Sequence, residues 1–148
     1  ISFAADTAID RGLPNEALTL LDADGAPRGD VDVKNLETAR TQAPKDKAGL
    51  AAETASAISK GDGEVIAVLG EAYLTYGEYE KAAEVLQTAL DKGVGDAGKA
   101  DVTRLHLGIA QLRMGNKDAA RATWAAVKAD NGATELAQSW ILISKVMP

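Results

Sequence analysis

The 148-residue sequence contains no cysteine, a single histidine and few aromatic residues, which make up 4% of the chain. Without cysteine, disulfide frameworks, thiol catalysis and thiolate metal sites are excluded. The histidine, His106, has no carboxylate or second histidine at metal-ligand spacing, and no G-x-S-x-G elbow supplies a nucleophile. We therefore expect no metal, no cofactor and no enzymatic activity. The lack of cysteine fits the cytoplasm and an oxidising periplasm equally well.

Long hydrophobic runs are also missing, as is any excess of positive charge. No stretch reaches the roughly 18–20 consecutive apolar residues of a membrane span, and no signal peptide is evident, so we expect no direct membrane insertion. Sixteen basic and 22 acidic side chains give a formal net charge of −6, which repels phosphate backbones and disfavours nucleic-acid binding. Because the chain begins at Ile1 instead of methionine, we expect a processed product or a fragment of a longer protein.

The composition favours helices. Hydrophobic residues make up 46% of the chain and alanine is abundant, whereas a β-sandwich would need more β-branched and aromatic residues. Alanine is the best intrinsic helix former and lets helices approach closely. The sequence therefore predicts an all-α fold.

An internal repeat organises the second half of the chain. Residues 63–94 align with residues 101–132 at one offset of 38, which matches Gly70 with Gly108, Gly77 with Gly115, and Leu86 with Trp124. Apolar residues in each segment follow the i, i+3, i+4 spacing of helices, and Gly77 and Gly115 are placed to end the first helix of each pair. We expect Gly70 and Gly108, with Ala82 and Ala120, to lie where neighbouring helices approach most closely.

This pattern resembles the tetratricopeptide repeat, whose unit of about 34 residues runs W-x2-L-G-x2-Y, then A-x3-F, then P. The first segment keeps Leu69, Gly70, Tyr73 and Ala82, and the second keeps Leu107, Gly108 and Ala120, with Trp124 as the aromatic residue. Ile66 and Arg104 replace the tryptophan. The resemblance implies a right-handed α-solenoid segment. The wider sequence resembles the C-terminal part of long secreted bacterial tetratricopeptide proteins of unknown function, which implies a periplasmic setting and further N-terminal repeats.

The rest of the chain extends this scheme to one domain over residues 1–148. We expect a degenerate helix pair over 1–24, where Gly12 and Ala17 repeat the spacing of Gly77 and Ala82. An alanine-rich helix pair over 31–60 is expected to divide near Pro44, because proline breaks a helix interior. A final helix over 134–146, which contains Trp140, is expected to cap the stack.

These observations predict a scaffold that binds a protein or peptide partner through the groove formed by the first helix of each pair. The groove residues expected from the repeat register are Glu64, Ala67, Glu71, Leu74 and Thr75 in the first repeat, and Val102, Leu105, Ile109, Leu112 and Arg113 in the second. Family members that clamp acidic C-terminal peptides carry lysine and asparagine at such positions, which are absent here.

Several alternatives stay open. The helix over 102–112 carries apolar residues almost all round, so Leu105, Ile109 and Leu112 are either a docking stripe or a buried face beneath the terminal helix. The segment could also serve mainly as a structural cap of a longer repeat protein, or form a homo-oligomer through Trp140 and its neighbours, and an enzyme is the third alternative.

Overall fold

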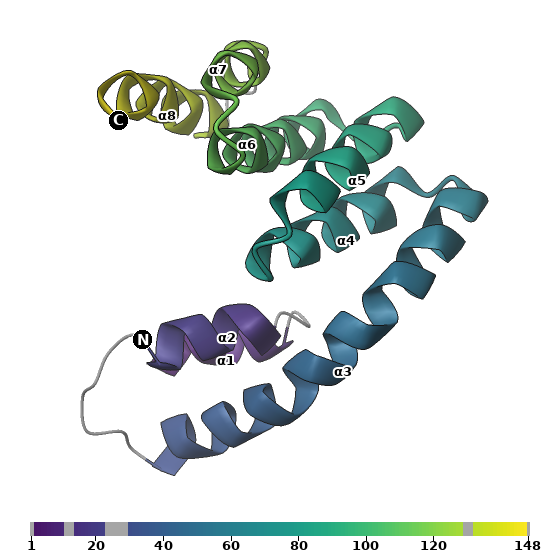
Figure 1. The fold of residues 1–148 in the computed structure, drawn as a ribbon, viewed down its shortest axis with the longest axis vertical. Helices are drawn as coiled ribbons and strands as arrows, with labels where there is room; N and C mark the ends of the chain where they lie inside the picture. The colour runs from purple at the N-terminus through teal and green to yellow at the C-terminus, as the bar shows by residue number, and fades with distance from the viewer. Residues whose placement is uncertain (1, 11–13, 23–29, 129–131, 148) are drawn as a thin grey trace. The chain divides into compact units, whose positions relative to one another are not determined.

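A computed structural model describes residues 2–10, 14–22, 30–128 and 132–147, and the described residues form eight α-helices and no strand (Figure 1). The all-α prediction is confirmed. The chain divides into two compact units, residues 1–51 and 52–148. Among the described residues, no helix combines the length and apolarity needed to cross a membrane.

The first unit contains α1 (Ser2–Asp10), α2 (Pro14–Asp22) and the first part of α3 (Asp30–Lys60). The helix pair expected over 1–24 is therefore present as α1 and α2, although Gly12 lies outside the described residues. Small side chains dominate the core of this unit, as the alanine content predicts. The core consists of Ala5, Ala8, Ala17, Leu21, Leu36 and Ala39, with Ile9 and Leu18 packed against it.

The helix α3 corrects a prediction. Residues 30–60 form one continuous helix with Pro44 in its interior, so the expected pair of helices divided near Pro44 is wrong. Proline removes one backbone donor and crowds the preceding turn, but it does not force a helix to end. The helix-forming residues after Pro44, five of which are alanine, with Ala39 and Ala43 before it, favour helix strongly enough to continue through that defect.

The second unit contains the end of α3 and two helical hairpins, α4 (Gly63–Thr75) with α5 (Tyr79–Lys92) and α6 (Ala97–Arg113) with α7 (Lys117–Ala125). The last helix is α8 (Ala133–Val146). Helices that follow one another in sequence, from α4 to α8, make most of the contacts, and α6 also contacts α4 and α8 (Figure 1). This arrangement stacks the two hairpins and then α8.

The hairpin ends follow the sequence signals. The carboxylate of Asp62 accepts a hydrogen bond from the backbone N–H of Val65 (3.2 Å) at the start of α4. Gly77 and Gly115 adopt positive φ angles of 73° and 85°, which is where glycine is favoured at a helix end. The helix α6 begins at Ala97, four residues before the repeat boundary at residue 101, because Asp96 caps it by accepting from the N–H of Lys99 (3.0 Å).

Close approach at the two repeat glycines is confirmed. A Cβ added to Gly70 would lie 2.7 Å from Cγ of Leu86, and one added to Gly108 would lie 2.1 Å from Nε1 of Trp124. The Trp124 indole N–H also donates to the backbone carbonyl of Leu105 at 3.1 Å. Both hairpins therefore close by packing one large side chain onto a glycine.

Candidate functional site

Three of the expected groove residues lie inside the protein. Ala67, Leu105 and Leu112 are buried, and the two leucines belong to a core cluster between α6, α7 and α8. The other members of that cluster are Ala120, Trp124, Val127, Ala133 and Ala137, with Ile109, Trp140 and Ile141 packed against it. The structure contradicts the groove assignment for these three residues and agrees with the buried alternative, because the apolar stripe of α6 is covered by α8.

Two further groove residues are engaged within the chain. Oε2 of Glu64 lies 2.9 Å from Nζ of Lys99, and Oε1 of Glu71 lies 2.9 Å from Nδ1 of His106. Both contacts join α4 to α6 across 35 residues of sequence. The hydrogen bond from Lys99 to Glu64, with the negative charge of that carboxylate, raises the pKa of Lys99 above its ordinary value. These two carboxylates of α4 therefore contact α6, the first helix of the other hairpin.

The remaining predicted residues lie at the surface without forming an evident site. Leu74 and Ile109 are half-buried, and Arg113 is exposed at the end of α6. The Thr75 hydroxyl donates to the backbone carbonyl of Ala72 at 2.8 Å. Val102, which the repeat register also places in the groove, is partly exposed. Of the predicted groove residues, these therefore form only a small surface of apolar and polar side chains.

His106 lies beside the carboxylate of Glu71. Over the described ranges, no three histidine or carboxylate side chains converge as metal ligands would. Its nearest ionisable contact is the single carboxylate of Glu71. One carboxylate beside one imidazole is too few ligands for a structural or catalytic zinc site.

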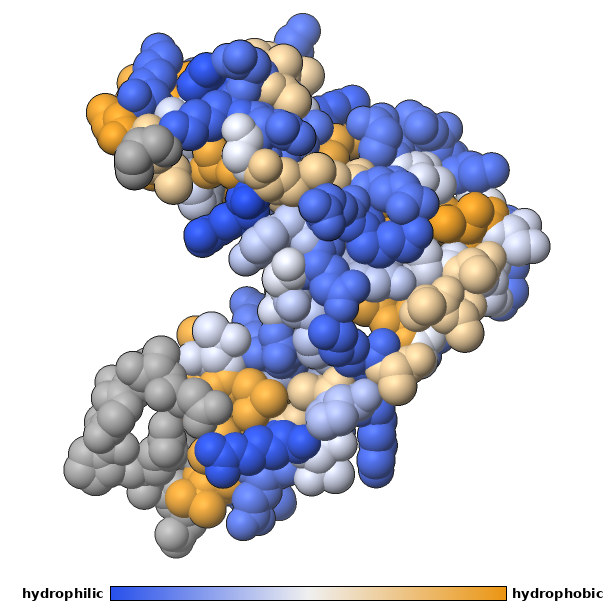
Figure 2. Space-filling model, viewed as in Figure 1, coloured by the Kyte–Doolittle hydropathy of each residue, from blue (hydrophilic) through white to orange (hydrophobic). Residues whose placement is uncertain are grey.

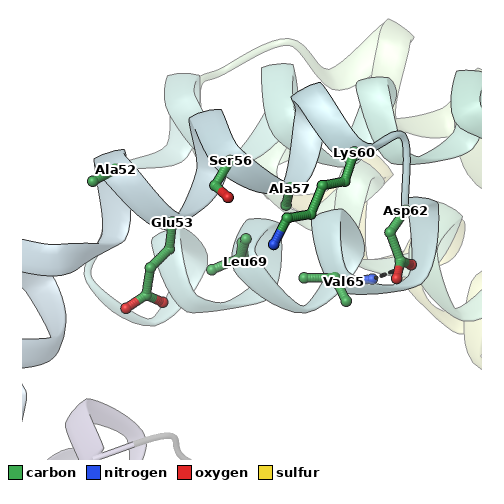
Figure 3. A pocket seen from close by; sticks show the side chains of 8 residues that line it. All are labelled: Ala52, Glu53, Ser56, Ala57, Lys60, Asp62, Val65 and Leu69. Atoms are coloured by element: carbon green, nitrogen blue, oxygen red, sulfur yellow. Dashed lines mark hydrogen bonds between the residues drawn. The ribbon is translucent and has the colours of Figure 1, made fainter.

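A concave site that the sequence did not predict lies between the end of α3 and the start of α4. This α3–α4 hollow has a volume of about 530 Å³ and is lined by Ala52, Glu53, Ser56, Ala57, Lys60, Asp62, Val65 and Leu69. Figure 3 shows Leu69 pointing from α4 toward α3, between the side chains of Glu53 and Lys60. Small residues of α3 face apolar residues of α4, so the lining is mainly apolar with opposite charges at its rim.

Comparisons with known proteins add no relative. No protein-family model matches the chain, and no curated protein or solved structure matches it.

The helix α8 presents a second surface that the sequence reasoning treated only as a cap. One of its faces packs on the core through Ala133 and Ala137, and the Trp140 ring stacks on that of Trp124 with centroids 5.7 Å apart. Another face leaves large apolar side chains exposed, including Leu136 and Ile143. The sequence already indicated this second apolar surface, because the apolar residues of α8 fall on two faces of the helix instead of one.

Proposed function

We propose that this chain is a protein-interaction scaffold of the tetratricopeptide type, which binds a peptide or protein segment along α4. The observation that carries the proposal is the α3–α4 hollow, an apolar depression at the surface of stacked helical hairpins. A partner would anchor an apolar side chain there. No catalytic step is part of the proposal.

The packing within the hairpins supports the repeat type. Gly70 receives Leu86 in the first hairpin as Gly108 receives Trp124 in the second, at the offset of 38 that defines the repeat. Contacts made mostly between successive helices are typical of repeat proteins, in which each unit packs on its neighbour. A right-handed solenoid of such hairpins, with α8 as its cap, is the arrangement that we propose.

The same offset explains why the hollow is available to a partner. Val65 of α4 corresponds to Thr103 of α6, which is only 2% exposed. Val65 is 47% exposed, because the small residues Ser56 and Ala57 of α3 stand opposite it and do not fill the space. The surface that is closed at the start of α6 is therefore open at the start of α4.

The size and chemistry of the hollow suit a peptide anchor. Its volume of about 530 Å³ falls within the range of roughly 300–1,000 Å³ of ligand pockets. Val65 would contact an apolar side chain, while the exposed carboxylate of Glu53 and ammonium of Lys60 would select for charges on either side of it. We therefore expect ligands with one bulky apolar residue between a basic and an acidic residue.

Selection of displayed 12-residue peptides against the chain tests this function. We expect enrichment of the apolar anchor with flanking charges, and binding at least about tenfold weaker after Val65→Lys, because the substitution places a charge in the contact. Val102→Lys adds the same charge to a partly exposed valine of α6 and is the matched control. Peptides that bind wild type and Val65→Lys equally well would contradict the proposed site.

A second candidate, capping or self-association of a repeat array, is favoured by the exposed apolar face of α8. The periplasmic setting implied by the family resemblance remains a prediction, which fractionation of the source cells would test.

A further inference from the structure

The end of α3 repeats the sequence at the end of α5. Residues 56–61 read SAISKG and residues 88–93 read TALDKG, so the two segments align at an offset of 32. Each ends at a glycine with a positive φ angle, 73° at Gly61 and 95° at Gly93. Since α3 precedes α4 as α5 precedes α6, the last turns of α3 are equivalent to the second helix of a hairpin.

This equivalence gives the α3–α4 hollow a counterpart within the second unit. Its α3 wall corresponds to α5 at the offset of 32, and its α4 wall corresponds to α6 at the offset of 38. The two offsets differ because extra residues lie between α5 and the repeated part of α6. The α5–α6 interface therefore indicates what occupies such a space when it is closed.

One lining position differs in burial between the two interfaces. Ala57 of α3 is buried, as is its equivalent in α5, Ala89. Glu53, one turn earlier in α3, is exposed, whereas its equivalent in α5, Val85, is completely buried. A carboxylate stays in water because burying it without a partner would cost more free energy than the apolar contact returns. The space beside α4 therefore stays open where the space beside α6 is closed.

The opposite wall has nearly the same size in both interfaces. Val65 of α4 corresponds to Thr103 of α6, and the two side chains have equal numbers of heavy atoms. Nevertheless, Val65 is exposed and Thr103 is buried. The difference in exposure thus follows the exchange of Glu53 for Val85 on the other wall. The side chain at this position in the closed interface is aliphatic.

The exchange also places a carboxylate where the closed interface has an apolar side chain. Figure 3 shows Glu53 and Asp62 at opposite ends of the hollow. The Asp62 carboxylate accepts from the backbone N–H of Val65 and caps α4, so Glu53 is the lining carboxylate that is placed to bind a cation. The positive charge of Lys60 is matched by Lys92 of α5 and does not distinguish the hollow. Figure 2 shows hydrophobic and hydrophilic side chains next to one another where α3 meets α4.

We propose that Glu53 keeps the α3–α4 hollow open for an aliphatic side chain of a protein partner, and that it binds a lysine or arginine next to that side chain in the partner. The partner's valine, isoleucine or leucine then takes the place that Val85 has between α5 and α6. This inference rests on the proposed function of the hollow. It makes the aliphatic residue with its basic neighbour the part of the ligand that the chain recognises.

The substitution Glu53→Val tests the opening, because it restores the residue of the closed interface. We expect the variant to unfold at a urea concentration about 0.3 M higher than wild type, since the valine covers apolar surface of α4. Displayed 12-residue peptides enriched on wild type should bind the variant at least about tenfold more weakly. Glu37→Val exchanges an exposed glutamate of α3 outside the hollow and should change neither quantity.

The substitution Glu53→Gln tests the charge, because glutamine has the same length and leaves the hollow open. We expect the enriched peptides to bind about threefold to fivefold more weakly at low salt, with a smaller difference at 1 M salt. Peptides in which glutamine replaces the basic residue should bind wild type and Glu53→Gln equally. A basic peptide that binds both proteins equally at low salt would overturn the assignment of the cation to Glu53.

The outcomes separate this inference from the proposed function. Enriched peptides that lose affinity with Val65→Lys but bind Glu53→Val as well as wild type would overturn this inference alone. A lower urea midpoint for Glu53→Val would also overturn it, because valine would then not fit the space. A selection that enriches no peptide on wild type would contradict both proposals. Circular dichroism confirms that each variant remains folded.

Discussion

Gly108 lies directly beneath the indole of Trp124, so close that a single methyl group on Gly108 would fall 2.1 Å from Nε1 of the ring. The same indole is held on its other sides by the Leu105 carbonyl, which accepts its N–H, and by the stacked ring of Trp140. Since the ring cannot shift without breaking one of these contacts, the packing of three helices depends on this one glycine.

We first predict that Gly108→Ala destabilises the chain by about 1–3 kcal/mol, although alanine is the better helix former, because the added methyl overpacks the α6–α7 contact. Urea denaturation measures the change. Trp124→Ala would remove the ring that the methyl group meets, so the double variant should be less destabilised than the sum of the two single variants. If the changes in the free energy of unfolding simply add in the double variant, the contact between the two positions is contradicted.

A second prediction concerns Asp101, a buried carboxylate at the start of α6. Its Oδ1 pairs with the guanidinium of Arg104, and its Oδ2 accepts from the backbone N–H of Lys128 at 2.8 Å. Asp101→Ala removes the acceptor from both partners, and we expect a loss of about 1–3 kcal/mol with faster hydrogen exchange at Lys128. Asp118→Ala is the control, because its pair with Arg121 is exposed at the carboxylate and should contribute at most about 1 kcal/mol.

The raised pKa of Lys99 gives a third prediction. Glu64→Gln removes the charge and the strong acceptor, so the pKa of Lys99 should fall toward its ordinary value of 10.5. Because the folded-state pKa is raised, the pair stabilises the fold at pH below 10.5, and this contribution is lost as the pH rises through the higher folded-state value. A titration of the lysine ε-carbon signal by NMR measures the shift. Glu84→Gln, which breaks the Lys81 pair on α5, should leave Lys99 unchanged.

Pro44 provides a fourth prediction. Since it lies inside α3, Pro44→Ala should restore a backbone donor, increase the helix signal in circular dichroism and stabilise the helix by up to about 3 kcal/mol. Pro14→Ala is the comparison, because Pro14 occupies the first position of α2, where proline is tolerated, and no gain is expected there. An equal gain from both substitutions would mean that the position of Pro44 within the helix is not what costs stability.

Much of the fold could be predicted from the sequence because its signals are local. Gly77 and Gly115 end helices through a backbone conformation that neighbouring residues cannot alter, and an offset of 38 aligns the two hairpins without any knowledge of their packing. Pro44 misled the prediction because its effect depends on how strongly the flanking turns favour helix. A prediction based on the proline alone does not take the helix propensity of the flanking residues into account.

The site was predicted less well, since it depends on contacts between helices. Whether Leu105 contacts a partner or the core depends on where α8 lies, and the repeat pattern alone does not place that helix. Glu71 contacts His106, which lies 35 residues later. The alignment at an offset of 38 matches equivalent residues of the two repeats and does not predict which of them are in contact. The α3–α4 hollow results from small side chains meeting where larger ones would have filled the space.

The order of contacts in the second unit has a kinetic consequence. Most contacts between the helices α4 to α8 join helices that are neighbours in the sequence. Helical proteins dominated by contacts between neighbouring elements fold in microseconds to milliseconds, and repeat arrays can nucleate at one unit and propagate. The hairpin α4–α5, which closes on itself where Gly70 meets Leu86 and where Gly63 meets the carbonyl of Gly93, is suited to be that nucleus.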